Sequence, residues 1–260
     1  MSGTVGRRFG RVRSEAAASF KTFVRRRTAV FFTFVFPVVL VVIFAGLVQS
    51  DGAGSGLFSR PTGYYVPGYL AVVVLFTPLS RVGSEVARYR ETNRFEKLAT
   101  SPLTRFEWLA AQSVVNVTLI LVASALLLGL LFLFGTSVPL SPWLLLYVVV
   151  GSIVFCGIGA LVGSAAASQD GAISLSNGIA LPTLFLSETF LAPSRFPPWF
   201  EPATLLSPLT YFSRGVRAAV YVPDPNQIGP ALGVVGHLAV LTALAVLFFV
   251  AGGMALSWTE

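Results

Sequence analysis

One serine and the single histidine of the chain are the best candidate pair for covalent chemistry. Ser152 follows a glycine in one long apolar run, and His237 follows a glycine in another. A serine within hydrogen-bonding reach of a histidine is the nucleophile and base arrangement of a hydrolase. Neither residue has an evident orienting partner, and the G-x-S-G-type turn expected around such a nucleophile is absent. Helix packing is therefore the favoured interpretation of Ser152.

Nucleotide-binding and metal-binding patterns are missing from the sequence. The only lysines are Lys21 and Lys97, and neither follows a glycine, so there is no G-x-x-x-x-G-K-[ST] loop for ATP. One cysteine, Cys156, and one histidine are too few for a disulfide framework or a Cys/His metal site. We therefore expect this chain to bind no cofactor.

The composition is typical of a membrane protein. Of the 260 residues, 55% are hydrophobic and only 11% are charged, whereas a soluble domain is about 25% charged. Too few polar side chains remain to cover a water-soluble globule, which argues against a soluble enzyme. Uncharged segments long enough to cross a bilayer predict one all-α membrane domain over residues 1–260, with six spans at about 28–48, 64–82, 108–134, 143–168, 171–191 and 231–258.

The basic residues indicate how these spans are oriented. Eight of the 18 Lys and Arg residues precede the first span, six lie between spans two and three, and four remain for the other side. Positive charge accumulates on the cytoplasmic side of membrane proteins. We therefore predict a multi-pass protein of the cytoplasmic membrane with both termini in the cytoplasm. This distribution also accounts for the net charge of +7 without a nucleic-acid partner.

The first 27 residues have the pattern of an amphipathic helix. Phe9, Val12, Ala16, Phe20 and Phe23 recur at helical spacing, with arginines on the other faces. Such a helix lies flat among lipid headgroups. A basic tail that only fixes the topology is the alternative.

Two segments between spans have unusual compositions. Residues 81–107 are highly charged, and the i,i+3 pairs Glu85–Arg88 and Glu91–Arg94 favour a cytoplasmic helix that could dock a partner; a solvated loop is the alternative. Residues 188–230 contain eight prolines yet are rich in apolar side chains. That composition predicts a segment that re-enters the membrane or lies on its outer surface.

The spans themselves offer hydroxyl and amide groups rather than charges. Their interiors contain no Asp, Glu, Lys or Arg, which argues against proton or sodium coupling within the chain. Asn177 and Thr183 are examples from the fifth span. Such groups either line a polar path or hydrogen-bond between packed helices.

Three motifs together resemble the ABC-2 type permeases, the membrane subunits of a class of ABC exporters. Residues 90–98 (RETNRFEKL), followed by a Ser-Pro pair, resemble the family's R-E-x-G-T-x-E-x-L…T-P motif. Residues 186–199 resemble its L-S-G…F-P…L-P-x-W end of span five. Residues 207–211 (SPLTY) and Arg217 resemble its N-P-L-T-Y…R segment. The sequence departs from these motifs where Asn93 and Arg94 replace Gly-Thr, and where Glu188 replaces a Gly.

The resemblance implies an exporter permease that moves an amphipathic or lipid-linked substrate by alternating access. It implies a cytoplasmic ABC ATPase partner, which would bind ATP and Mg, and a second permease subunit, either a copy or a related chain. Residues 81–98 would form the coupling helix, and residues 163–171 a second contact. The residues implied for ATPase coupling are Arg90, Glu91, Arg94, Phe95, Glu96 and Leu98. Those implied for the translocation path or an outer gate are Asn177, Thr183, Ser187, Glu188 and Tyr211.

Two other functions stay open at the level of sequence. A passive structural membrane protein would also have uncharged spans and no nucleotide site. A rhomboid-like intramembrane serine protease is the third hypothesis, and it rests on Ser152 and His237 alone. The substrate, and the choice between a homodimer and a heterodimer, do not follow from the sequence.

Overall fold

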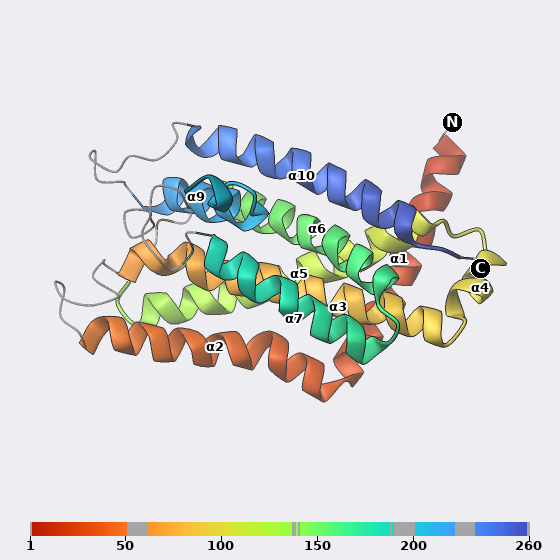
Figure 1. The fold of residues 1–260 in the computed structure, drawn as a ribbon, viewed down its shortest axis with the longest axis horizontal. Coiled ribbons are helices and arrows are strands. Elements are labelled where there is room, and N and C mark those ends of the chain that lie inside the picture. The colour runs from red at the N-terminus through yellow and green to blue at the C-terminus, as the bar shows by residue number, and fades with distance from the viewer. Residues whose placement is uncertain are drawn as a thin grey trace.

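The computed structural model of the chain describes residues 2–50, 62–136, 139, 141–187, 189, 201–221 and 232–258. Within these ranges every regular element is a helix, which confirms the all-α prediction (Figure 1). The helices are α1 (Ser2–Arg25), α2 (Arg27–Ser50), the 3₁₀ turn η1 (Thr62–Tyr65), α3 (Val66–Glu91), α4 (Arg94–Ala99), α5 (Arg105–Leu133), α6 (Pro142–Ala165), α7 (Gln169–Leu186), α8 (Glu201–Thr204), α9 (Pro208–Val220) and α10 (Gly233–Ala255).

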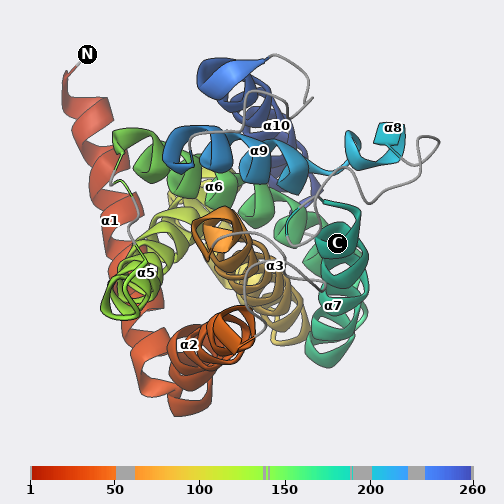
Figure 2. The ribbon, with the colours of Figure 1, turned by 90° about the vertical axis from the view of Figure 1, so that its left-hand side faces the viewer.

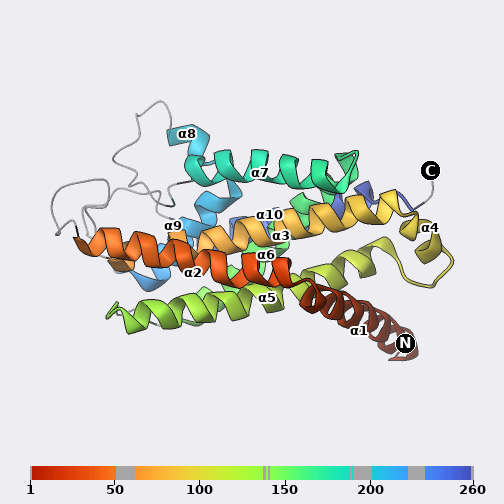
Figure 3. The same cartoon turned by 90° about the horizontal axis from the view of Figure 1, so that it is seen from below.

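Apart from α1, the long helices lie side by side along the length of the molecule (Figures 1 and 3). Helix α3 is the centre of the bundle and contacts α2, α5, α6, α7 and α9, as the view along the bundle in Figure 2 shows. Helices α1 and α4 and the C-terminal residues lie at one end, which we call the basic end. Helix α9 lies toward the opposite end and packs against α3, α6 and α10.

Small residues allow α6 to approach both of its main neighbours closely. A Cβ atom added to Gly163 would lie 2.3 Å from the carbonyl oxygen of Gly83 on α3. One added to Gly157 would lie 2.4 Å from the backbone carbonyl carbon of Phe248 on α10. Helices in membranes commonly pack through such small residues, because close backbone contact replaces the hydrophobic effect as the attractive force.

Four described helices are long and apolar enough to cross a membrane: residues 63–91, 105–133, 142–165 and 233–255. They correspond to the predicted spans two, three, four and six. Helices α1 and α2 qualify only as a pair bent by 81°, which raises the count to five. The predicted span five corresponds to α7, which is shorter, at 18 residues, and carries several polar side chains. The described residues therefore give four or five candidate spans by length and composition, and the predicted count of six is not confirmed.

The second predicted span and the charged segment after it form one helix. Helix α3 continues without a break from Val66 past the expected span end at residue 82 to Glu91. The chain then turns at Asn93, the one described non-glycine residue with positive φ (51°), and α4 begins. Asparagine tolerates this left-handed conformation better than most residues, so it can replace the glycine that is usual in the family motif.

Of the two ion pairs predicted for this charged segment, one forms in the structure. The Glu85 carboxylate pairs with Arg88 as expected. The Glu91–Arg94 pair does not form, because the turn at Asn93 separates the two residues. Charged pairs at i,i+3 support one another only where the helix is continuous.

Two predicted helix starts agree with the structure in position. At the start of α5, the Thr104 hydroxyl accepts a hydrogen bond from the Glu107 amide at 3.2 Å, and the Glu107 carboxylate accepts one from the Thr104 amide at 2.9 Å. This is the predicted capping box. Helix α9 begins at Pro208, with Ser207 at the N-cap position. The Ser207 hydroxyl, however, donates to the carbonyl of Thr183 on α7 instead of capping the helix.

Candidate functional site

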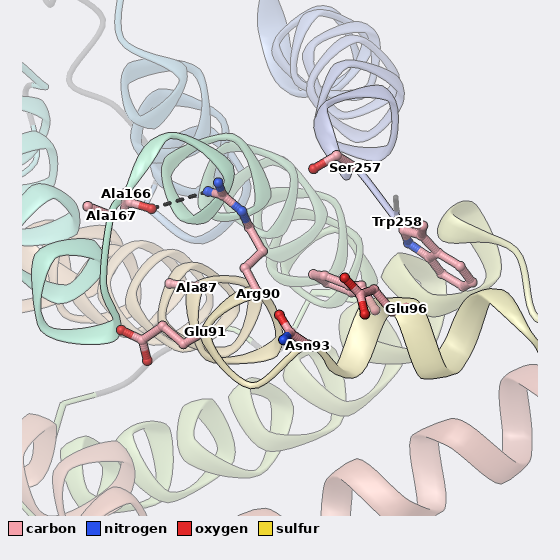
Figure 4. A pocket seen from close by; sticks show the side chains of 10 residues that line it. Ala87, Arg90, Glu91, Asn93, Glu96, Ala166, Ala167, Ser257 and Trp258 are labelled. Atoms are coloured by element: carbon pink, nitrogen blue, oxygen red, sulfur yellow. Dashed lines mark hydrogen bonds between the residues drawn. The ribbon is translucent and has the colours of Figure 1, made fainter. Parts of the chain in front are cut away.

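A polar hollow of about 270 Å³ lies at the basic end of the bundle (Figure 4). Four separate segments build it: the end of α3, helix α4, the loop between α6 and α7, and the residues that follow α10. Its lining consists of Ala87, Arg90, Glu91, Asn93, Phe95, Glu96, Ala166, Ala167, Ser257 and Trp258. Four of the six predicted coupling residues therefore gather at one place.

Arg90 joins the end of α3 to the end of α6. Its Nη1 atom donates to the carbonyl oxygen of Ser164 at 2.5 Å and to that of Ala166 at 3.2 Å. Figure 4 shows the guanidinium reaching across the hollow toward Ala166. Unpaired carbonyls at a helix C-terminus carry partial negative charge, so a cation is stabilised there.

Glu91 makes the complementary contact with the start of α7. Its Oε1 atom accepts a hydrogen bond from the backbone amide of Gln169 at 2.9 Å. A helix N-terminus carries partial positive charge and stabilises a carboxylate. Adjacent residues of α3 thus bind the C-terminus of α6 and the N-terminus of α7. Together they attach the loop predicted as a second coupling contact, residues 163–171, to the segment predicted as the first.

Helix α4 is held to the bundle by an aromatic cluster. Phe95 is buried, and its ring centroid lies 5.3 Å from that of Tyr89, 5.2 Å from that of Trp108 and 6.1 Å from that of Trp258, on which it stacks. Leu98 is partly buried against the same cluster. Phe95 and Leu98 therefore position α4 from beneath, and the charged residues of α4 face outward.

The other two predicted coupling residues differ in their contacts. Glu96 is exposed and lines the hollow. Arg94 is exposed, does not line it, and lies over the ring of Tyr89 at 5.5 Å. Sequence reasoning missed Trp258 as part of this site and interpreted it only as a marker of a span end. The spacing of its partners along the chain gives no signal for this contact, since it joins segments that are far apart in the sequence.

Helix α1 is attached to α5 near the hollow. Arg11 donates from Nη2 and Nε to the two carboxylate oxygens of Glu107, at 2.5 and 3.1 Å. Ser19 donates to Gln112 at 2.8 Å. The predicted apolar face of α1 is divided: Phe23 is buried against the bundle, whereas the other two phenylalanines, Phe9 and Phe20, are exposed. A helix that offers one face to protein and another to its surroundings fits the predicted position at a membrane surface.

The bend between α1 and α2 is fixed to α3 by a buried carboxylate. Glu85 on α3 pairs with Arg88, and one of its oxygens lies 3.7 Å from Arg26, the residue between α1 and α2. Burial raises the pKa of Glu15 on α1, and the nearby carboxylate of Glu85 raises it further. The basic end therefore joins α1, α3, α5, α6 and α7 through charged side chains.

Comparison with protein families identifies the chain. The family model for the ABC-2 type transporter matches residues 12–221. The chain belongs to this family. It is the membrane component of an ABC transporter, and the family works with a cytoplasmic ABC ATPase. A comparison with curated proteins gives no significant match.

At the opposite end of this ABC-2 permease, some predicted path residues make hydroxyl contacts. The hydroxyls of Ser187 and Thr189 are in contact, and that of Thr189 lies 3.0 Å from that of Ser213 on α9. Tyr211 on α9 lies beside His237, with ring centroids 6.4 Å apart. Glu188 lies outside the described residues.

The remaining path residues lie on α7. The Thr183 hydroxyl donates to the carbonyl of Ile179 in its own helix at 2.7 Å. Asn177 is exposed, on the face of α7 that also carries Ser174 and Gly178. The predicted path residues are therefore distributed over two places in the permease, an exposed face of α7 and the contact between α7 and α9.

The candidate protease residues bond within their own helices. The Ser152 hydroxyl donates to the carbonyl of Val148 at 2.6 Å. Nδ1 of His237 lies 2.7 Å from the carbonyl oxygen of Gly233. A serine that bonds back to the preceding turn is common in membrane helices. This geometry supports the packing interpretation of Ser152 in the ABC-2 permease.

Proposed function

We propose that this permease exports an amphipathic or lipid-linked substrate across the cytoplasmic membrane, powered by a separate ATPase that docks at the basic end. The observation that carries the proposal is the pair of contacts made by Arg90 and Glu91. They attach the α3–α4 segment to both α6 and α7. A displacement of α4 by the ATPase would therefore reach three membrane helices at once.

The central position of α3 supports transmission over the length of the bundle. The helix is 26 residues long and is buried along most of its length, and a continuous α-helix rises about 1.5 Å per residue. If α3 is tilted at Glu91, residues at its other end would therefore move by a distance proportional to the length of the helix. Alternating access then follows from a change in how α3, α6 and α7 pack.

Six spans fit the proposed topology. Helix α7 packs along α3 (Figure 3), and 18 residues extend about 27 Å, close to the thickness of a hydrocarbon core. Helix α2 carries exposed phenylalanines, including Phe31 and Phe32, as expected for a lipid-facing span. With both counted as spans, the basic end faces the cytoplasm, in agreement with the positive-inside rule.

The exposed face of α7 supports pairing with a second permease subunit, a copy of this chain or a related one. Ser174 and Asn177 are exposed there, and a Cβ atom added to Gly178 would meet no atom within 4 Å. Polar side chains in a span are usually turned to protein or to a polar cavity, because hydrocarbon cannot hydrogen-bond with them. The proposed path runs between two such faces, where hydroxyl, amide and apolar groups suit an amphipathic molecule.

A reconstitution experiment tests this function. The tagged permease is purified in mild detergent, and any co-purifying protein with a P-loop is identified and reconstituted with it in proteoliposomes. We expect ATP hydrolysis coupled to transport of an amphipathic probe. The double variant Glu91→Lys/Glu96→Lys should enter the membrane normally but lose coupling. Normal coupled transport by that variant would contradict the proposed role of the basic end.

The same preparation separates the alternatives. A passive structural protein would co-purify with no ATPase and would tolerate the double reversal. An intramembrane protease would lose all function in Ser152→Ala, whereas the proposed exporter should keep transport in that variant, since the Ser152 hydroxyl only bonds to its own helix.

A further inference from the structure

The hollow at the basic end has an unbalanced distribution of charge. Its charged lining residues are Arg90, Glu91 and Glu96. The guanidinium of Arg90 is directed to two backbone carbonyls. Glu96 is exposed, and its carboxylate forms no ion pair within the described part of the chain. Arg90 is thus bound to the end of α6 and Glu91 to the start of α7, which leaves the Glu96 carboxylate as the charged group available to a partner.

An aromatic ring forms another part of the hollow. Trp258 lines it, and the buried ring of Phe95 stacks on the indole with an interplanar angle of 19°. Figure 4 shows Glu96 and Trp258 on the same side of the hollow, with Ser257 above them. A carboxylate beside an indole is a favourable environment for a long cationic side chain, because its charge meets the carboxylate and its stem or guanidinium packs on the ring.

We propose that the hollow receives a lysine or arginine side chain of the cytoplasmic ATPase, bound by the Glu96 carboxylate and packed against Trp258. This inference rests on the proposed function and specifies the chemistry of the partner. The recipient surface combines residues of α4 with the tail after α10, so docking would depend on that tail as well as on α4. The bound ATPase would thereby fix the position of α4 relative to the end of α10.

An acidic partner fits this hollow less well. An entering carboxylate would approach Glu91 and Glu96, and like charges in proximity are unfavourable. Arg90 could offset this only by leaving the carbonyls of Ser164 and Ala166, which would expose the C-terminus of α6 without its cation. The described contacts therefore favour a basic occupant.

The test measures affinity between the permease in nanodiscs and its ATPase, identified by mass spectrometry after co-purification. Glu96→Gln, which keeps the shape of the side chain, should weaken binding about 10-fold, as expected for the loss of one charged partner in a recessed contact. Trp258→Leu should weaken it less. Lys97→Gln is the matched control, because Lys97 is exposed on the same helix but does not line the hollow; it should leave the affinity within about 2-fold.

A charge exchange completes the test. Glu96→Lys should weaken binding further, and exchange of one basic residue of the ATPase for glutamate should restore it in that variant only. Equal affinity for wild type and Glu96→Gln would overturn the inference while leaving ATPase docking intact. Tighter binding by Glu96→Lys than by wild type would also overturn it, because an acidic occupant would be attracted by the new lysine. Absence of any ATPase binding by the wild-type permease would instead refute the proposed function itself.

Discussion

Helix α7 is attached by different chemistry at its two ends. At the basic end, Arg90 and Glu91 bind the termini of two helices, and Glu85 fixes the bend before α2. At the opposite end, the contact between α7 and α9 is made by the neutral hydroxyls of Thr189 and Ser213. Charged contacts to helix termini are strong and directional, whereas hydroxyl contacts are weaker and easily exchanged. The charged contacts suit the proposed coupling to an ATPase, and the hydroxyl contact suits the proposed outer gate.

Removal of the Phe95 ring should have the largest effect, and it should act on the basic end alone. In Phe95→Ala the buried ring that holds α4 is lost, which should destabilise the basic end by about 3 kcal/mol and abolish coupling of ATP hydrolysis to transport. Hydrogen exchange measured by mass spectrometry should increase over residues 94–99 and stay unchanged in α9. Equal increases at both ends would show that the ends are not independent.

Separation of α3 from α6 should affect both ends together. A Cβ atom at Gly163 would collide with the backbone of Gly83, so Gly163→Ala should destabilise the protein by about 2 kcal/mol. Gly129→Ala on α5 is the matched control, since its Cβ atom would meet no atom within 4 Å. Thermal unfolding in detergent measures both. A Gly163→Ala variant as stable as the control would mean that the close contact between α3 and α6 is not needed.

Loss of the Arg90 contacts should act on the basic end alone. In Arg90→Gln the carbonyls at the end of α6 lose a cationic donor, which should cost about 1–2 kcal/mol locally and lower the transport obtained per ATP hydrolysed. Hydrogen exchange should increase over residues 164–169. Wild-type coupling in Arg90→Gln would contradict the role assigned to this contact.

The smallest effect should come from the hydroxyl contact at the opposite end. Ser213→Ala removes one partner of Thr189 and should change stability by about 1 kcal/mol or less. Transport rates for different amphipathic probes should change unequally, whereas ATPase affinity should match that of wild type. A loss of ATPase affinity would contradict the proposal that docking belongs to the basic end and gating to the opposite end.

Local chemistry explains what could be predicted from the sequence. The capping box at Thr104, the helix start at Pro208 and the Glu85–Arg88 pair involve residues within four positions of one another. Uncharged runs predicted the four clear spans, since bilayer thickness sets their length. The motif at residues 90–98 pointed to the family that the comparison then confirmed.

Long-range contacts explain what could not be predicted. The partner expected for Glu91 was Arg94, but the left-handed turn at Asn93 separates them, and Glu91 binds Gln169 instead. Trp258 was not connected with Phe95, 163 positions earlier in the chain, although the two rings stack. The hydrophobic periodicity of a sequence does not predict such a pairing, because the pairing depends on how the helices pack.

The sequence by itself determined the membrane class, the four clear apolar spans, the absence of a nucleotide-binding loop and the position of the family motif at residues 90–98, because composition and short-range spacing act locally. Only the tertiary structure decided that Arg90 and Glu91 join the ends of α6 and α7 to α3, and that Glu96 and Trp258 share one hollow. Close contact between α3 and α6 at Gly163 brings these segments together. The physical reason is that the partial charge at a helix terminus stabilises an oppositely charged side chain, and the packing of the helices decides which side chain lies beside it.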